Sequence, residues 1–391
     1  MSSYCTNIVI VSAARTPMGA FQGSLSSLSA PQLGARAITE AIARSRLSSD
    51  RVCEIIMGNV LPAGCGQAPA RQAAILGDVP EHVPATTVNK VCGSGMKAIM
   101  LGCAQLQLQE ANVIVAGGME SMSNAPYLLG KARQGFRLGH GDVKDHMFTD
   151  GLEDAYSGQL MGAFAQETAD RFDISREAMD SYALTSLERA NKAITEGRFV
   201  SEIIPVVTRE STVDTDEQPG RAKPEKIRQL KPAFSKTGTI TAANASSISD
   251  GAAALVMMRE EDALAQGLTP LARIKGYHTH AREPAEFTLA PVDAIKALQQ
   301  TLGWSGSDVD CYEINEAFAV VALAAISMLE LDSGRVNIYG GACALGHPLG
   351  ASGARIVVTL LNALEQTGGR KGIASLCIGG GEATAIAIER Y

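Results

Sequence analysis

Hydrophobic positions along the first third of the chain alternate between short β-branched runs and longer stretches with helical spacing. Apolar runs at residues 7–12, 54–60 and 112–118 are typical of strands that are buried on both faces of a sheet. Apolar residues recur with helical spacing at residues 33–43, and a second helix is expected at about 94–109. Strands that alternate with helices in this way predict an α/β fold built on a parallel sheet.

The pattern changes between residues 119 and 249, where glycine, charge and methionine are scattered. Residues 131–142 show no period, and one helix is expected at about 176–196. Strand signals are few, so we interpret this segment as an insertion into the first α/β half. One stretch carries a cluster of cations, namely Arg221, Lys223, Lys226, Arg228 and Lys231, beside a single acid, Glu225. Such a cluster is either a solvated surface or a clamp for phosphate groups.

The last third of the chain repeats the hydrophobic pattern of the first. Its strand patterns at residues 308–317 and 371–381 have counterparts at 51–60 and 112–118. A helix of small residues that opens at 350–354 also has a counterpart in the first third. The repeat predicts two similar α/β halves, and their seam is the natural place for a ligand.

This repeat also sets the expected domain boundaries. The N-terminal half comprises residues 1–118 together with about 250–268, which follow the insertion. The insertion itself spans residues 119–249, and the C-terminal half spans 269–391.

Composition narrows the classes of protein to which the chain can belong. At 391 residues, with 46% hydrophobic and 19% charged residues, it is long enough for about two or three compact domains. The net charge of −7 argues against a nucleic-acid binder. The sequence shows neither a secretory leader nor an uncharged apolar stretch long enough to span a bilayer. We therefore expect a soluble cytoplasmic protein that binds neither nucleic acid nor membrane.

Cysteine and histidine positions give no sign of a metal site or a disulfide framework. The eight cysteines include no C-x-x-C pair and are too sparse for a disulfide scaffold. His278 and His280 form a close pair, and we expect them in a solvated loop because no further ligand follows at fixed spacing.

Cys92 is the first candidate for chemistry. It follows a β-branched segment and precedes a small-residue run that can open a helix, so its sulfur is expected beside free N–H groups that lower its pKa. Gly93 and Gly95 are expected to allow a substrate to approach closely. The alternative is that Cys92 is a small buried hydrophobic residue, as most free cysteines are.

Three further stretches favour function over structure. His347 lies in a glycine-rich loop beside a proline, where it can take a proton from a thiol or stabilise an oxyanion. Cys377 ends a strand pattern and is followed by three glycines whose N–H groups can bind an anion. Asn315 and Glu316 at another strand end can orient a water or a carbonyl, although turn asparagines are common.

Taken together and in order, these motifs resemble those of the thiolases over essentially the whole chain. The resemblance implies an α/β duplicated thiolase fold, with two similar halves in a layered α-β-α-β-α arrangement and a loop-domain insertion in the first half. The class it most resembles is the biosynthetic one, which forms acetoacetyl-CoA. The matching motifs are VSAARTP at 11–17, NKVCGSG at 89–95, AGGMESM at 116–122, NEAF at 315–318, GHPLG at 346–350 and CIGGG at 377–381.

This resemblance implies a role for each matching residue. Cys92, activated by His347, would accept an acetyl group, and Cys377 would remove a methyl proton from a second acetyl-CoA. His347 and a water held by Asn315 would stabilise the enolate, while N–H groups of Cys92 and Gly379 would form a second oxyanion site. The reaction would be a reversible Claisen condensation of two acetyl-CoA to acetoacetyl-CoA and coenzyme A. It would use an acyl-cysteine intermediate and no cofactor or metal.

The insertion resembles the thiolase loop domain, which covers coenzyme A. Arg221 would lie near the coenzyme A phosphates. Residues 131–142 resemble the tetramerisation loop of the biosynthetic class, which implies a homotetramer built as a dimer of dimers. Further substrate or coenzyme A contacts are implied for Phe234, Ala242, Ala243, Ser246, Leu160, Met161 and Phe318.

Two departures from the family pattern bear on the substrate. Leu160 stands where acetoacetyl-type thiolases usually carry a histidine near the acyl group, and residues 286–291, with Phe287, replace a Met-Gly-x-Gly-Pro type of loop. Less polarity at Leu160 favours a longer or branched acyl chain. Residues 88–95 are nevertheless closer to the acetoacetyl class. We therefore expect acetyl transfer, with a broader 3-ketoacyl-CoA thiolase of acyl-chain degradation as the alternative.

Two other classes compete with these. A decarboxylating ketosynthase would pair its cysteine with two histidines or with a histidine and an asparagine, which Cys377 and the form of the His347 loop disfavour. A catalytically silent thiolase-fold binding protein would have lost at least one chemical residue. All four, namely Cys92, Asn315, His347 and Cys377, are present.

Overall fold

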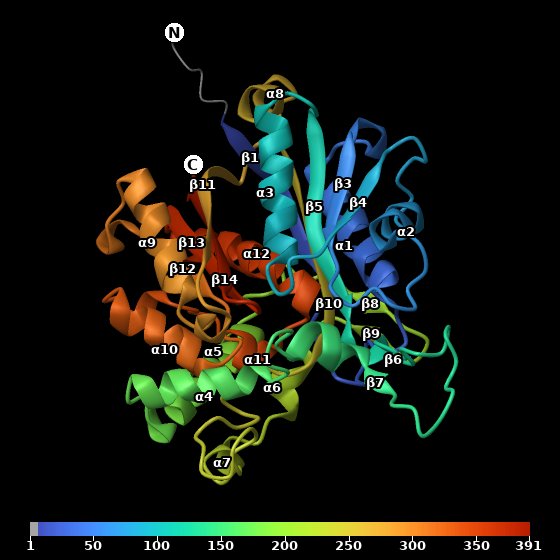
Figure 1. The fold of residues 1–391 in the computed structure, drawn as a ribbon. Helices are drawn as coiled ribbons and strands as arrows, with labels where there is room; N and C mark the ends of the chain where they lie inside the picture. The colour runs from blue at the N-terminus through green and yellow to red at the C-terminus, as the bar shows by residue number, and fades with distance from the viewer. Residues whose placement is uncertain (1–6) are drawn as a thin grey trace.

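The computed structural model describes residues 7–391, and a ten-stranded mixed sheet runs through it (Figure 1). A short pairing between the first strands of the two halves, β1 and β11, joins the halves edge to edge. In hydrogen-bonding order, the first half contains β1 (Ile8–Arg15), β10 (Ser249–Arg259), β5 (Val113–Ser121), β3 (Glu54–Gly58) and β4 (Ala85–Val88), with β2 (Gly19–Ala20) beside β10. The second half contains β11 (Ala272–Ala281), β14 (Glu382–Arg390), β13 (Lys371–Ile378) and β12 (Cys311–Ile314).

The strand order confirms the predicted duplication. The first half runs β1-β10-β5-β3 and the second runs β11-β14-β13-β12, so each strand of one half has a counterpart in the other. The expectation of a parallel sheet is wrong, because only β3 with β4 and β5, and β12 with β13, are parallel. One reason is that a short turn at residues 379–381 connects β13 to β14. A turn of this length can join only antiparallel strands.

Helices complete the layers that the resemblance implies. The two halves of the sheet face each other across a central layer of helices, and other helices cover the two outer faces (Figure 1). The alternation α-β-α-β-α is therefore confirmed. The central helices are α3 (Ser94–Gln107) and α12 (Leu349–Thr367), the outer helices of the first half are α1 (Ala30–Ser45) and α2 (Pro69–Leu76), and those of the second are α9 (Ala290–Leu302) and α10 (Ala319–Met328).

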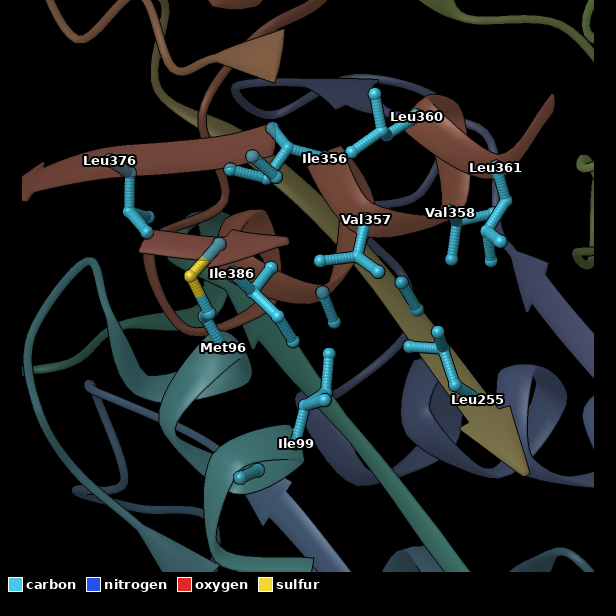
Figure 2. Packing of buried hydrophobic residues seen from close by; sticks show 14 of the residues in the cluster. Met96, Ile99, Leu255, Ile356, Val357, Val358, Leu360, Leu361, Leu376 and Ile386 are labelled. Carbon is cyan, nitrogen blue, oxygen red and sulfur yellow. The ribbon is translucent and has the colours of Figure 1, made fainter. Parts of the chain in front are cut away.

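The core lies where α12 meets α3 and both halves of the sheet. Every residue of α12 from Leu349 to Leu364 is buried, which is typical of a helix enclosed on all sides. Figure 2 shows Met96 and Ile99 of α3 facing this helix, with Leu255 of β10 and Leu376 of β13 nearby. The first turns of both central helices are thus buried in this core.

One glycine sets how closely the start of α12 approaches the sheet. A Cβ atom on Gly118 of β5 would lie 2.0 Å from the carbonyl oxygen of Gly350. Since that neighbour is backbone, we expect Gly118→Ala to lower the free energy of unfolding by about 3 kcal/mol, as measured by urea denaturation. Gly130→Ala, whose Cβ would have nothing within 4 Å, is the control. A Gly118→Ala change below about 1 kcal/mol would contradict this packing.

The insertion is mostly helical and loop. The helix expected at 176–196 is confirmed as α5 (Arg176–Thr195), and α4 (Met161–Arg171) precedes it without having been expected. The remaining helices of the chain are α6 (Glu217–Arg221), α7 (Pro224–Ile227), α8 (Glu260–Ala265) and α11 (Ala342–Leu345). Short strands form two ribbons, β6 (Tyr127–Leu128) with β7 (Lys144–Asp145) and β8 (Val206–Val207) with β9 (Thr212–Val213). Single turns of other helix types are η1 (Ser49–Arg51), η2 (Met122–Asn124), η3 (Phe148–Leu152), η4 (Pro284–Glu286), η5 (Gly306–Asp308) and η6 (Ser333–Arg335).

A buried arginine ties the insertion to the first half. Arg15 at the end of β1 donates to both carboxylate oxygens of Asp216, at 2.7 and 2.9 Å, and to Glu202 at 2.5 Å. All three side chains are almost fully buried, so each charge depends on its partners. Asp216 directly precedes α6, and the ion pairs therefore fix the segment that begins with this helix.

Several smaller expectations can be compared directly with the structure. His278 and His280 lie in β11 rather than in a loop, with stacked rings 6.5 Å apart, because the strand pairs with β14 along this stretch. Seven cysteines in the described part are free thiols, and Cys5 lies outside it. Within residues 7–391, none of the helices combines the length and apolar character needed to cross a membrane.

Candidate active site

The predicted chemical residues come from both halves and from the ends of the central elements. Cys92 lies in the turn between β4 and α3, and His347 lies between α11 and α12. Asn315 directly follows β12, Cys377 is the penultimate residue of β13, and Gly379 opens the turn after it. The seam between the halves therefore brings together loops that are far apart in sequence.

The turn that carries Cys92 is strained. Val91 has a φ of 45°, a conformation that β-branched residues rarely adopt, and its N–H donates to the side chain of Asn89 at 2.9 Å. Lys90 N–H donates to Ser94 Oγ at 2.8 Å, which closes the turn at the start of α3. The backbone thus holds the sulfur of Cys92 in one place, with 9% of the residue exposed.

The electrostatics of Cys92 differ from the expectation. Burial raises its pKa to about 11, although N–H groups of Gly379 and of Cys92 itself act in the opposite direction. The negative charge of Glu120 raises the pKa slightly further. The expected low pKa is therefore wrong for the resting protein, because the loss of water outweighs the helix terminus.

The second cysteine lies close to the first. Cys377 is almost fully buried, and burial together with the neighbouring Cys92 raises its pKa well above the ordinary value of a thiol. The hydrogen bond from the Gly379 N–H places the turn after β13 against the Cys92 sulfur. Both sulfurs and one backbone donor therefore share one small volume.

His347 faces the same seam as a neutral imidazole. Its Nδ1 lies 2.5 Å from Ser352 Oγ and 3.5 Å from Asn315 Nδ2. Burial and the nearby charge of Arg355 lower its pKa to about 3. Its Nε2 and the Oδ1 of Asn315 are buried and have no hydrogen-bond partner within residues 7–391. Two buried polar atoms are thus available to form a hydrogen bond with a reacting group. A histidine and an asparagine with only a structural role would not leave these atoms unpaired.

Two buried carboxylates hold the loops of the site. Glu316 was expected beside Asn315 as a group that orients a water or a carbonyl, whereas Glu120 had no expected role. Glu316 accepts hydrogen bonds from Tyr182 Oη, Ser186 Oγ, Asn337 Nδ2 and Cys343 N–H at 2.8 to 3.0 Å. It therefore ties the loop after β12 to α5 and to α11. The signal was its place in the NEAF motif.

The other carboxylate is Glu120 in β5. It accepts hydrogen bonds from N–H groups of Val60, Leu61 and Gly350 and from Asn59 Nδ2, at 2.7 to 3.2 Å. Gly350 is in the first turn of α12, so this negative charge stabilises the N-terminus of that helix. Burial nevertheless raises the pKa of Glu120 to about 7.

The glycines beside Cys92 are packed closely against other parts of the chain. A Cβ atom on Gly93 would lie 2.4 Å from Ile378 Cδ1, and one on Gly95 would lie 2.9 Å from the backbone of Ala354 and Gly350. Close packing against the adjacent protein therefore requires glycine at both positions, and their role in admitting a substrate stays a prediction.

A groove of about 340 Å³ leads along the insertion. It contains the predicted Arg221, Ala242 and Ala243, and also Lys223 and Lys226 of the cation cluster. Arg221 is more than half exposed and pairs with Glu217 at 2.9 Å. Arg228 and Lys231 are not among the residues that line it, so the structure divides the cation cluster in two.

The predicted aromatic contacts lie beside this groove. Phe318 packs edge-on against Phe234 and Phe287, with ring centroids 6.1 and 6.3 Å apart. Ser246 N–H donates to Ala317 at 2.9 Å, which places it next to Phe318.

Leu160 and Met161 lie at the start of α4, which connects the aromatic cluster with the cysteines. Leu160 precedes the helix and Met161 is its first residue. A Cβ atom on Gly379 would lie 3.4 Å from Met161 Sδ, so this methionine adjoins the turn beside Cys92. Across residues 7–391, no group of three or more His, Cys, Asp or Glu residues could hold a metal ion.

Comparison with known proteins is consistent with this geometry. The chain is 51% identical to acetyl-CoA acetyltransferase 2 of Arabidopsis thaliana, over 98% of this chain and 97% of the relative. It is 52% identical to an acetyl-CoA acetyltransferase of Escherichia coli, over 98% and 99%. The crystal structure of Acat5 thiolase from Ascaris suum in complex with coenzyme A superposes with a TM-score of 0.95 at 45% identity, covering 98% of this chain and all of that one.

Family models match nearly the whole chain in two parts. Residues 8–261 match the N-terminal domain of thiolase, and residues 268–390 match the C-terminal domain. The duplicated fold, the two cysteines at one seam and these matches agree, and the chain belongs to the thiolase family.

Proposed function

We propose that the protein is an acetyl-CoA C-acetyltransferase that catalyses the reversible condensation of two acetyl-CoA to acetoacetyl-CoA and coenzyme A. The proposal rests on two observations, namely that Cys92 adjoins Cys377 and the Gly379 N–H, and that His347 and Asn315, which adjoin each other, keep buried polar atoms without a partner. The names of relatives about half identical to this chain support the same substrate.

In the first half-reaction, His347 Nε2 takes the proton of Cys92 and the sulfur attacks the thioester carbonyl. N–H groups of Cys92 and Gly379 stabilise the oxyanion, which cannot form readily in so apolar a site without donors. The departing coenzyme A sulfur takes the proton of Cys377. The site then holds acetyl-Cys92 and a Cys377 thiolate.

In the second half-reaction, the Cys377 thiolate takes a methyl proton from a second acetyl-CoA. The imidazolium of His347 and a water on Asn315 stabilise the enolate oxygen. The enolate carbon attacks the acetyl group, and Cys92 leaves and recovers its proton from His347. All protons are returned, so the same residues run the reaction in either direction.

We propose that coenzyme A binds in the groove along the insertion. The insertion, residues 119–249, would then be the loop domain that covers coenzyme A. Three cations line this groove, namely Arg221, Lys223 and Lys226. Because the protein carries a net charge of −7, the phosphates of coenzyme A require such a local cluster of positive charge. We further propose a homotetramer, since Leu138 in the loop at 131–142 is 96% exposed. The cytoplasmic location and the lack of a cofactor stay predictions of the sequence.

A series of 3-ketoacyl-CoA substrates tests the proposed acyl length. We expect kcat/KM for thiolysis to be at least about 10-fold higher for acetoacetyl-CoA than for a substrate two methylenes longer, since Phe287 and Phe318 close the apolar side of the site. A maximum at longer chains would make the protein a broader 3-ketoacyl-CoA thiolase. A lack of turnover with every substrate would reject the enzymatic proposal.

The same series identifies the contribution of Leu160. Leu160→His adds a polar group beside Met161, so we expect it to sharpen the preference for acetoacetyl-CoA about threefold. Leu264→His on α8, where the leucine is 59% exposed, makes the same change away from the site and should leave the profile unaltered. An unchanged profile for both variants would mean that Leu160 does not set chain length.

A further inference from the structure

A buried serine lies directly behind the proposed base. Ser352 is in the first turns of α12, five residues after His347, and is fully buried. Its Oγ lies 2.5 Å from His347 Nδ1 and 2.8 Å from the carbonyl oxygen of Pro348. The hydroxyl thus touches two groups, and neither contact was assigned a role above.

Counting hydrogens fixes the direction of both contacts. A serine hydroxyl has one hydrogen and two lone pairs. The Pro348 carbonyl can only accept, and a 2.8 Å approach of two oxygens without a hydrogen between them is repulsive. The hydroxyl hydrogen therefore points to Pro348, as is usual for a serine bonded to the carbonyl four residues earlier in a helix. The Ser352 oxygen therefore faces His347 Nδ1 with a lone pair, which can only accept a hydrogen bond.

We propose that Ser352 is a positioning residue that accepts a hydrogen bond from His347 Nδ1–H and thereby keeps Nε2 unprotonated and aimed into the site. The inference rests on the proposed function, because it assigns Nε2 as the atom that takes the Cys92 proton. An imidazole with the opposite tautomer would present an N–H there and could not accept that proton.

The charges around His347 explain why the acceptor is a neutral hydroxyl. Arg355, one turn further along α12, is fully buried, and its positive charge opposes a second proton on the ring. A carboxylate at position 352 would instead favour the charged imidazole. The serine orients the ring without making it more basic, so the base stays neutral until Cys92 gives up its proton.

Ser352→Ala tests this role with two measurements. We expect kcat for thiolysis of acetoacetyl-CoA and the rate of Cys92 alkylation by iodoacetamide to fall about 10- to 100-fold. The KM for acetoacetyl-CoA should change less than about twofold, because the hydroxyl does not line the coenzyme A groove. Ser352→Thr keeps the hydroxyl and should recover most of both rates.

Thr359→Ala is the matched control. Thr359 is also a fully buried hydroxyl on α12, but it donates to Glu202 at 3.1 Å, away from His347. It should retain both rates while losing a similar amount of thermal stability. Equal losses of rate in Thr359→Ala and Ser352→Ala would overturn the inference, and so would a wild-type alkylation rate in Ser352→Ala or a Ser352→Thr variant as slow as Ser352→Ala.

These measurements distinguish a failure of the proposed function from a failure of the positioning role of Ser352. If the unaltered protein turned over no thioester, the acetyltransferase assignment would fall, yet the alkylation rates of Cys92 would still compare the two forms of position 352. If turnover occurred and alkylation were insensitive to Ser352→Ala, only the positioning role would be rejected.

Discussion

Cys92→Ala is expected to lower kcat for thiolysis of acetoacetyl-CoA by about 10⁴-fold or more. The strained turn at Val91 holds the sulfur, where the Gly379 N–H donates to it. Without it, thiolysis would require direct attack of the coenzyme A sulfur on acetoacetyl-CoA, with no covalent intermediate to divide the barrier. Mass spectrometry after mixing with acetyl-CoA should show an acetyl group on Cys92 in the unaltered protein and none in this variant.

The control for this variant is Cys103→Ala. Cys103 is also buried and lies within α3, the helix that follows the turn of Cys92, inside the core. It should keep kcat within about threefold while losing about 1 kcal/mol of stability. Retention of activity by Cys92→Ala would reject the acyl-cysteine route.

Cys377→Ala is expected to separate the two half-reactions. Overall turnover should fall about 10³-fold, since no base is left for the methyl proton, whereas acetyl-CoA in excess should still acetylate Cys92. The physical reason is that a coenzyme A thiolate is a stable anion that can leave without the proton of Cys377, whereas the methyl proton of the second substrate cannot be removed without a base. Turnover is checked by steady-state kinetics and the adduct by mass spectrometry.

Cys311→Ala removes a similarly buried thiol from the start of β12 and serves as the control. Loss of both the adduct and turnover in Cys377→Ala, with Cys311→Ala unaffected, would show that the second cysteine is needed already for acyl transfer. Wild-type turnover in Cys377→Ala would remove it from the mechanism.

Much of the fold was predictable because its signals are local. The strands at β1, β3 and β5 and the helix α3 follow from apolar runs and spacing, and the repeat follows from comparing the two ends of the chain. The direction of β10 and β14 was not predictable in this way. The direction of a strand depends on the end of the sheet at which the chain returns to it. For β10, the chain returns after the long insertion, whose course cannot be predicted from local sequence patterns.

The site was predictable as a set of residues but not as an electrostatic environment. Cys92, His347 and Cys377 stand out beside glycines, and the structure brings them to one seam. The high pKa of Cys92 comes from burial under residues distant in sequence, which a local pattern cannot contain. The contact of Ser352 with His347 was hidden for a related reason: a serine in a small-residue helix looks like any other packing residue.

The opposite pKa shifts of Cys92, to about 11, and of His347, to about 3, mean that both groups rest uncharged. Peroxide and small electrophiles attack thiolates far faster than thiols. If Cys92 is the nucleophile, as proposed, we expect its burial to keep the thiol protonated until a thioester fills the site and so to protect it from chance oxidation. On this proposal, the substrate differs from a damaging reagent in that only the substrate brings the sulfur to its reactive thiolate state.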